Sequence, residues 1–303
     1  TDSPIATIGV NAFEDTGLTT VELPNRVIDI GVNAFGSSIT SNTIGKHLIH
    51  IPLPDASSTE LDLSGYDILT IADQPEAKIS NTAITKLVLP RSLKLIGAKA
   101  FAQFESLETV EVSNIPTDIS LNLEVIREHA FNSNIKVLEL DSNKYVIKAD
   151  SLADITDDVI LIADGACKDL TGSINHIPKS VRHIGKNAFG PNAPEYIDKW
   201  LINASISRIK FAENSLEFNE YRVIDNTIMI ADDAFSSLEL SVDRIIIPNN
   251  TLKETEVYAP GYESGTKLAL IRYPHGGTFE IPICTVNNKN PLGKKLIGTD
   301  PID

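Results

Sequence analysis

Cysteines and long apolar runs are scarce in this chain of 303 residues. Its two cysteines, Cys167 and Cys284, are too few for a disulfide framework, so we expect two free, partly buried thiols. No run of 18 apolar residues occurs, which excludes a transmembrane helix. No basic start followed by an apolar stretch is visible either, so no signal peptide is predicted, and the start at Thr1 leads us to expect a processed or trimmed chain.

Positive charge is also in short supply. Lys and Arg total 26 and Asp and Glu total 41, which gives a net charge of −15. A chain this acidic repels phosphate backbones, so nucleic-acid binding is not expected. Hydrophobic residues make up 42% of the chain, enough for a large core, and the charged share of 22% argues against global disorder.

Recognisable catalytic motifs are missing as well. The sequence contains no phosphate-binding loop, no Gly-x-Gly-x-x-Gly, no His-Glu-x-x-His zinc motif and no Gly-x-Ser-x-Gly nucleophile motif. We therefore predict no enzymatic activity and no cofactor. The remaining information is in the repetition of short segments.

A six-residue anchor, Ile-Gly-x-x-Ala-Phe, recurs along the chain. With about 1 in 20 odds per fixed residue, chance gives roughly one match per hundred thousand positions. The exact copies are Ile8–Phe13, Ile30–Phe35, Ile96–Phe101 and Ile184–Phe189. Looser copies are Ile126–Phe131, Ile162–Cys167, Ile230–Phe235 and a degenerate stretch at Ile71–Ile79. Several copies lie about 22 residues or twice that apart, a spacing within the leucine-rich-repeat range.

A second element follows the anchors: an apolar residue, two variable ones, then apolar-x-apolar, often closed by Pro. Its period-2 pattern and β-branched residues predict a short strand that Pro ends. The copies lie at 18–24, 48–54, 84–90, 107–112, 135–140, 206–211 and 242–248. One coil cannot bury its own apolar face, so we expect stacked coils, with Ile and Phe of successive anchors filling one spine. Phe35→Ala should then cost about 3–5 kcal/mol.

These patterns predict an α/β leucine-rich-repeat solenoid over residues 1–282, with a C-terminal cap or flexible tail at 283–303. Parallel strands should line one face and short helices or turns the other. Extra β-hairpins are expected in the C-terminal half, at 143–164, 219–230 and 267–282, because turn residues separate paired apolar runs there. Residues 190–203 read as an insertion, in which 195–202 could form one or two helical turns.

The anchors and the Leu-x-x-Val-x-Leu-Pro strands resemble the BspA-like leucine-rich repeats of bacterial surface proteins. The unit at 270–282 is similar to the hairpin-bearing variant of that family, and the resemblance covers about residues 5–282. The resemblance implies export, display on a bacterial surface, and binding of host or bacterial partners. It does not imply a particular ligand, and the chain lacks the stalk and sorting motif that would accompany display.

Side chains on the outer face of the predicted sheet are the candidate ligand contacts. We select Glu22, His50, Lys86, Glu111, Glu139, Arg208, Lys210 and Arg244. The order runs from acidic to basic, and the late basic residues could hold an anionic ligand or an acidic loop. An ordinary solvated face is the alternative interpretation.

Other side chains suggest weaker sites. Asp154, Asp157 and Asp158 could bind calcium but lack the EF-hand order, so an Asp-rich hairpin turn is expected. His47 and His50 should point to opposite faces of a strand, which disfavours a metal site. Cys167 and His176 could pair as nucleophile and base, yet Cys167 takes a Phe position and should be buried and inert. Exposed aromatics, which could bind sugars or anchor a protein unless they belong to the core, are Trp200, Tyr258, Tyr262 and Tyr273.

Three functions remain open on sequence. The first is a secreted or cell-surface adhesion module, a monomer without membrane insertion, that binds a protein or glycan ligand on the sheet face. The second is a structural spacer that displays another module. The third is an enzyme built on the insertion at 190–205, which would need a pocket lined by convergent polar groups.

Overall fold

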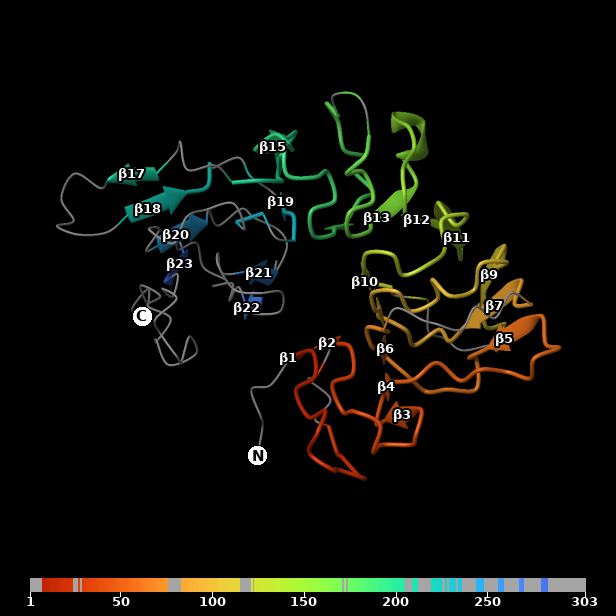
Figure 1. Ribbon diagram of the computed structural model, residues 1–303. Coiled ribbons are helices and arrows are strands. Elements are labelled where there is room, and N and C mark those ends of the chain that lie inside the picture. The colour runs from red at the N-terminus through yellow and green to blue at the C-terminus, as the bar shows by residue number, and fades with distance from the viewer. Residues whose placement is uncertain are drawn as a thin grey trace. The chain divides into compact units, whose positions relative to one another are not determined.

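A computed structural model describes residues 7–23, 27, 29–75, 83–114, 121, 123–170, 172, 174–204, 209–211, 219–224, 227, 229–232, 234–235, 244–247, 256–258, 267–269 and 279–282 (Figure 1). The chain divides into two compact units. The first consists of Thr1–Leu170 and Pro178–Ala188, and the second of Thr171–Ile177 and Phe189–Asp303. The predicted single repeat domain at 1–282 stays a prediction, and the tail at 283–303 lies outside the described residues.

Short strands dominate both units. The strands of the first unit are β1 (Thr7–Ile8), β2 (Asp29–Ile30), β3 (Thr43–Ile44), β4 (His47–Leu48), β5 (Glu60–Asp62), β6 (Thr70–Ile71), β7 (Lys86–Leu89), β8 (Leu95–Ile96), β9 (Thr109–Val112), β10 (Val125–Ile126), β11 (Val137–Leu140), β12 (Asn143–Val146), β13 (Val159–Ile162) and β14 (His183–Ile184). Those of the second are β15 (Tyr196–Ile197), β16 (Trp200–Leu201), β17 (Ile209–Phe211), β18 (Asn219–Arg222), β19 (Met229–Ile230), β20 (Arg244–Ile247), β21 (Glu256–Tyr258), β22 (Lys267–Ala269) and β23 (Phe279–Pro282).

The predicted α/β class is wrong for the described part of the chain. Its one helix is a single 3-10 turn, η1, at Leu152–Asp154. Residues 195–202, where helical turns were considered, form the hairpin β15–β16 instead. Turns take the place of helices because the six-residue anchor already reverses the direction of the chain. No helix among the described residues is long and apolar enough to cross a membrane.

The anchors pair as parallel ladders, in which an anchor isoleucine lies beside the next one wherever no hairpin-bearing coil intervenes. The pairs are Ile8 with Ile30, Ile71 with Ile96, Ile96 with Ile126, and Ile162 with Ile184. In these pairs the residue that follows the later isoleucine donates its N–H to the isoleucine carbonyl of the coil before. These bonds run from Gly31 to Ile8 at 2.9 Å, from Gly97 to Ile71 at 2.9 Å and from Gly185 to Ile162 at 2.8 Å. The anchor is thus the element that joins coil to coil.

Two anchor positions have special backbone requirements, and they differ. The left-handed residue is the fourth, not the glycine at the second position. The residues with positive φ at the fourth position are Asn11, Asn33, Lys99, His129, Gly165 and Asn187, between 49° and 65°. The second-position glycine serves close approach: a Cβ on Gly97 would lie 2.5 Å from the Ala72 carbonyl carbon. Glycine is needed there because the preceding coil occupies the space of a side chain.

The anchor aromatics stack across neighbouring coils as expected. The ring centroids of Phe13 and Phe35 are 5.7 Å apart, and those of Phe101 and Phe131 are 5.4 Å apart. Phe35, Phe101 and Phe131 are buried, while Phe13 is 38% exposed. Cys167 takes the aromatic position of its anchor and is buried, so a smaller side chain fills this position of the core in that coil.

The consecutive strands β17–β18 and β21–β22 pair antiparallel. Three further hairpins among the described residues, β3–β4, β11–β12 and β15–β16, are each inserted into one coil. All three close with the same bond, in which the residue after the second strand donates its N–H back across the hairpin. The donors are Ile49, Ile147 and Ile202, and the acceptors Asn42, Lys136 and Glu195, at 2.7–2.8 Å. The turns use left-handed residues, Gly45, Asp141 with Ser142, and Asp198. Such turns match the twist of paired strands.

The predicted hairpins at 143–164, 219–230 and 267–282 are wrong in their pairing, although strands do form there. β12 and β13 pair in parallel, because η1 and its flanks give enough chain for a crossover. β18 pairs with β17 and β20, while β19 pairs with β16. β22 pairs with β21, and β23 with β20. Local turn residues therefore identified strands but not their partners.

Candidate binding surface

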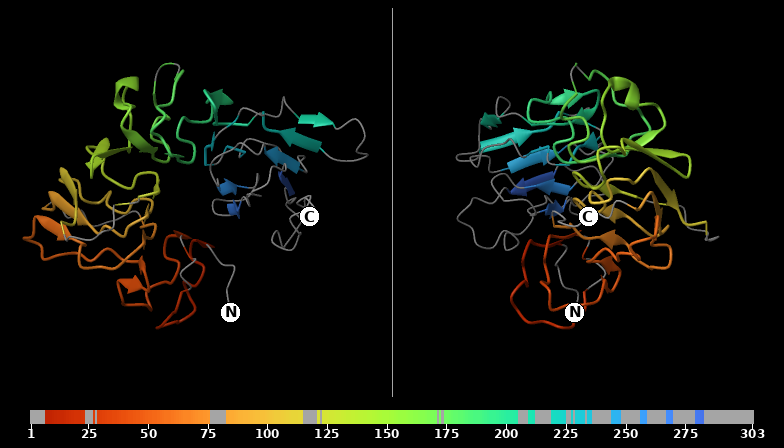
Figure 2. Two further views of the ribbon diagram at one scale, coloured as in Figure 1. Left: turned by 180° about the vertical axis from the view of Figure 1, so that it is seen from behind. Right: turned by 45° about the vertical axis from the view of Figure 1, so that its right-hand side comes forward.

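The second repeat element builds a three-stranded parallel sheet, β5–β7–β9, whose strands lie side by side in every view (Figures 1 and 2). Glu60 pairs with Lys86, and Lys86 with Thr109. The side chains alternate: Leu61, Leu87 and Leu89 are buried. The opposite side carries Glu60, Asp62, Lys86, Val88, Thr109 and Glu111, each exposed or half-buried, and we call it the β5–β7–β9 face.

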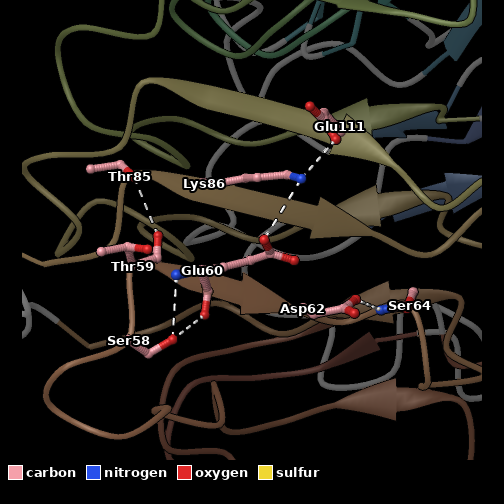
Figure 3. A network of polar contacts seen from close by, with 8 residues as sticks. All are labelled: Ser58, Thr59, Glu60, Asp62, Ser64, Thr85, Lys86 and Glu111. Carbon is pink, nitrogen blue, oxygen red and sulfur yellow. Dashed lines mark hydrogen bonds and ion pairs between the residues drawn. The ribbon is translucent and has the colours of Figure 1, made fainter.

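Lys86 lies at the centre of this face, between two carboxylates from the neighbouring strands (Figure 3). Its Nζ is 3.1 Å from Glu111 Oε2 and 3.6 Å from Glu60 Oε2. The hydrogen bond with Glu111 and the attraction of both carboxylates raise the pKa of Lys86 above its ordinary value. The ammonium therefore stays charged and is held in place. Since Asp62 adds a further carboxylate, the face as a whole is acidic.

Serine side chains close the open edges of two sheets. β5 is an outer strand of its sheet, and Ser58 Oγ accepts the Glu60 N–H at 3.3 Å while donating to the Glu60 carbonyl at 2.8 Å (Figure 3). Ser41 makes the same pair of bonds, 3.3 and 2.8 Å, to Thr43 on β3, an outer strand of another sheet. We call Ser41 and Ser58 the edge serines. Each bonds both the N–H and the carbonyl of one residue on its outer strand, Thr43 or Glu60.

The predicted contact residues separate in the structure. Lys86 and Glu111 meet on one face, as expected. Glu139 lies exposed on β11, which pairs antiparallel with β12, and its carboxylate is 3.6 Å from Lys144. Glu22 and His50 are exposed. The described residues 18–23 and 49–54 form no strand, which corrects the prediction of strands at 18–24 and 48–54, where only Leu48 lies in a strand, β4.

The predicted basic patch cannot be assembled from the described residues. Arg208 lies outside them, and the side chains of Lys210 and Arg244 are not described. The backbone register does place Lys210 opposite Glu220, and Glu220 opposite Arg244. A carboxylate-bearing residue therefore separates the two cations in that row. The patch stays a prediction, and the register does not favour it.

The secondary candidates have structural roles. Asp154 Oδ2 accepts the backbone N–H groups of Asp150 and Ser151 at 2.8 and 2.9 Å, and so caps η1. Asp158 pairs with Lys144 at 2.8 Å. Trp200 is buried on β16, which corrects its prediction as an exposed aromatic. Tyr262 and Tyr273 lie outside the described residues, and the side chain of Tyr258 is not described. The described residues contain no cluster of three His, Cys, Asp or Glu that could hold a metal.

The three histidines and the cysteine considered for weaker sites differ in burial and in their partners. His47 is buried with Nδ1 2.7 Å from Thr70 Oγ1, and burial lowers the pKa of His47, whereas His50 is exposed. Cys167 is buried, and desolvation raises the pKa of Cys167 to about 12. His176 belongs to the second unit and has Nδ1 2.7 Å from Asp198 Oδ2. A thiol held in its neutral form is a poor nucleophile.

A buried ion cluster in the first unit has no counterpart among the predicted residues. Arg127, which replaces the anchor glycine in its coil, binds Asp29 at 2.6 Å and Asp73 at 3.1 Å. Burial alone would lower the pKa of Arg127, but Asp29, Asp73 and Asp164 together raise it. The nearby hollow over Ile30–Gly36 holds about 90 Å³. Ligand pockets usually hold roughly 300–1,000 Å³, so the cluster fastens coils rather than binding a ligand.

A match to a family model agrees with this repeat architecture. A family model described as the BspA type leucine rich repeat region matches six copies, at residues 2–53, 75–192 and 154–259. No curated protein matches the chain. A leucine-rich repeat protein from Bacteroides ovatus is similar at 16% identity over 85% of this chain, with a TM-score of 0.27, and the chain spans 65% of that protein.

A leucine rich cell surface protein from Faecalibacterium prausnitzii is similar at 17% identity, over 86% of this chain and 84% of its own, with a TM-score of 0.23. The family model alone covers well over half of the sequence. The six copies include the coils in which Ile and Phe anchors were recognised above. This chain therefore belongs to the BspA-type leucine-rich-repeat family.

Proposed function

We propose that the chain is a secreted or cell-surface, non-catalytic binding module that takes a protein ligand on the β5–β7–β9 face. The observation that carries the proposal is a sheet face on which exposed charged side chains of three neighbouring strands form ion pairs. Lys86 is held by Glu60 and Glu111, so these groups lose little freedom when a ligand meets them. Preorganised charges of this kind give specificity to an interface.

A protein ligand is favoured over a glycan. The outward residues of β5, β7 and β9 include no aromatic side chain on which a sugar could stack. They offer carboxylates, a threonine and one fixed ammonium instead. Export to the cell surface is part of the proposal because the family includes bacterial surface proteins, and so is a continuous solenoid, which the coil-to-coil ladders of the first unit support.

Charge reversal tests the proposal. We expect the combined change Glu60→Lys, Asp62→Lys and Glu111→Lys to abolish binding to whichever ligand the unmodified chain selects from a panel of matrix proteins. The matched control reverses Asp55, Asp157 and Asp169, which are exposed and lie outside the face. The control changes the net charge by the same amount, so it distinguishes a loss of contacts at the face from an effect of overall charge on binding.

Two outcomes would reject the proposal. Equal loss in both triple variants would mean that net charge alone drives binding. Absence of any ligand across protein and glycan panels would favour the structural spacer instead. Circular dichroism of each variant checks that the sheet is intact.

A further inference from the structure

The first coil exposes a surface that the later coils of the first unit bury. Three of its side chains are among the exposed large hydrophobic residues: Val10 at 59%, Phe13 at 38% and Leu18 at 37%. One face of Phe13 is covered, since its ring stacks on Phe35 with the planes 6° apart. The equivalent Phe35, Phe101 and Phe131 are each at most 4% exposed. The exposed side of the first coil is therefore the side on which other coils receive a neighbour.

The anchor glycines indicate what kind of neighbour fits the exposed side of the first coil. A Cβ on Gly31 would lie 2.7 Å from Val10 N, and one on Gly185 would lie 2.6 Å from Asp164 N, both atoms belonging to the preceding coil. A Cβ on Gly9, the same position of the first anchor, meets nothing within 4 Å. Gly9 has no positive φ that would call for glycine on its own account. Its glycine thus matches a close approach that only a further coil makes elsewhere in the chain.

The hydrogen-bonding pattern gives the register of that neighbour. At the described coil junctions the second anchor residue donates its N–H to the carbonyl of the apolar residue paired with its isoleucine in the coil before, as Gly31 does to Ile8 and Ala72 to Leu48. The aromatic position of the earlier coil donates to the alanine carbonyl of the later one, as Phe13 does to Ala34 at 2.7 Å and Phe101 to Ala130 at 2.7 Å. By the same rule Gly9 N–H and the Ala12 carbonyl are the groups that an incoming coil would use.

We propose that the first coil, residues 7–23, is a docking surface for one further coil of the same repeat type, seated in register on Gly9 and Phe13. Its isoleucine would lie beside Ile8, and its aromatic ring would cover the exposed face of Phe13. The surface continues the coil-to-coil interface already present between Ile8 and Ile30. Repeat proteins gain stability from each such neighbour interface, so the occupant should stabilise the whole first unit.

A fused coil tests this proposal on the complete chain. A copy of residues 83–104, which carries one strand and one anchor, is joined ahead of Thr1 by a flexible Gly/Ser linker, because linking raises the effective concentration of a weak partner. The control copy has its anchor residues Ile96, Ala100 and Phe101 each changed to Ser. We expect the intact copy alone to raise the urea midpoint and to slow amide exchange at Gly9 by about tenfold or more.

Substitution of Gly9 provides the second arm of the experiment. Gly9→Val should leave the urea midpoint of the unfused chain unchanged, because nothing lies within 4 Å of the new Cβ. In the fused chain the same substitution should abolish the rise in urea midpoint, since the valine side chain occupies the space that the backbone of the fused coil would take. Gly65→Val, at a glycine with equally open surroundings, is the matched control and should leave the gain intact.

The proposal is overturned if the intact and control copies protect Gly9 equally, or if Gly9→Val leaves the gain in place. It is also overturned if light scattering shows that the unfused chain dimerises and that Phe13→Ser makes it monomeric, because the occupant would then be a second copy of the chain. The test needs no ligand for the β5–β7–β9 face, so its outcome is separate from that of the proposed function.

Discussion

Asp73 and Asp164 hold the same place in two coils: the carboxylate of each accepts the backbone N–H of the third anchor residue in the next coil at 2.8 Å. The donors are Ala98 and Lys186. Each aspartate also follows a hairpin-bearing coil and donates its own N–H past that coil to an earlier anchor isoleucine. Those bonds are 2.9 Å from Asp73 to Ile30 and 3.1 Å from Asp164 to Ile126. The pair shows how the coil stack is maintained where a hairpin interrupts it.

The first prediction concerns the side chain of Asp164. Asp164→Ala should lower the free energy of unfolding by about 1–3 kcal/mol, because the Lys186 N–H loses its acceptor in a part-buried place. Asp164→Asn keeps an oxygen in position and should cost less. Urea denaturation of both variants gives the comparison, and equal losses would show that charge, rather than the hydrogen bond, matters at this site.

The anchor aromatics should differ in how much they contribute to the free energy of unfolding, according to their burial. Phe101→Ala should cost about 3–5 kcal/mol, because Phe101 is fully buried against Phe104 and Phe131. Phe13→Ala should cost clearly less, since water already reaches one side of the Phe13 ring. Thermal and urea unfolding measure both changes. A Phe13 variant as damaging as the Phe101 variant would contradict the stacking order described here.

Stability should fall as the pH is lowered below about 6.5, the ordinary pKa of histidine. Burial lowers the pKa of His47 in the folded chain, so between that lower pKa and about 6.5 the unfolded chain binds more protons than the folded one. Protons therefore favour unfolding in this window, and the contribution of neutral His47 is complete only above it.

His47→Gln removes this titrating group and supplies the control for the pH effect. The urea midpoint of the unmodified chain should drop more between pH 8 and pH 5.5 than that of the variant. All other residues are identical in the two proteins, so the difference between the two pH profiles isolates His47. Identical pH profiles for the two proteins would show that His47 does not contribute.

Cys167 should resist alkylation in the native protein. Burial keeps the thiol neutral, with its pKa raised to about 12, and only the thiolate reacts. In a Cys284→Ser background, iodoacetamide should label Cys167 only at the rate of unfolding, as mass spectrometry would reveal. Rapid labelling of the folded protein would contradict the burial of Cys167 at the aromatic position of its anchor.

Sequence periodicity predicted the repeat itself correctly, because anchors and strands are local patterns. Strands at 84–90, 107–112 and 135–140 appear within one or two residues of their predicted bounds. Pairing was not predictable in the same way: Asn143 and Val159 begin strands that any hairpin rule would join, yet the crossover through η1 makes them parallel. Pairing depends on what lies beside a strand, which turn residues alone do not encode.

The coil-fastening residues were missed for a different reason. Asp29, Asp73 and Arg127 are charged residues that a search for exposed contacts passes over, because their partners lie up to 98 positions away along the chain. A usable signal does exist in the sequence. The tripeptide Ile-Ala-Asp occurs at 71–73, 162–164 and 230–232. Each copy is the anchor start that follows a hairpin-bearing coil; Asp232 in the third copy is buried, and Asp73 and Asp164 are half-buried.

The edge serines have a consequence for how any ligand can be recognised. An extended peptide often joins a sheet by hydrogen bonding to the main chain of an outer strand, a mode that is tolerant of peptide sequence. Ser58 already takes up the outward amide and carbonyl of Glu60, so strand addition at β5 would first have to break two bonds. A ligand at this edge would therefore be recognised through side chains such as Lys86. Single substitutions can change such side chains, so the choice of partner can change one residue at a time.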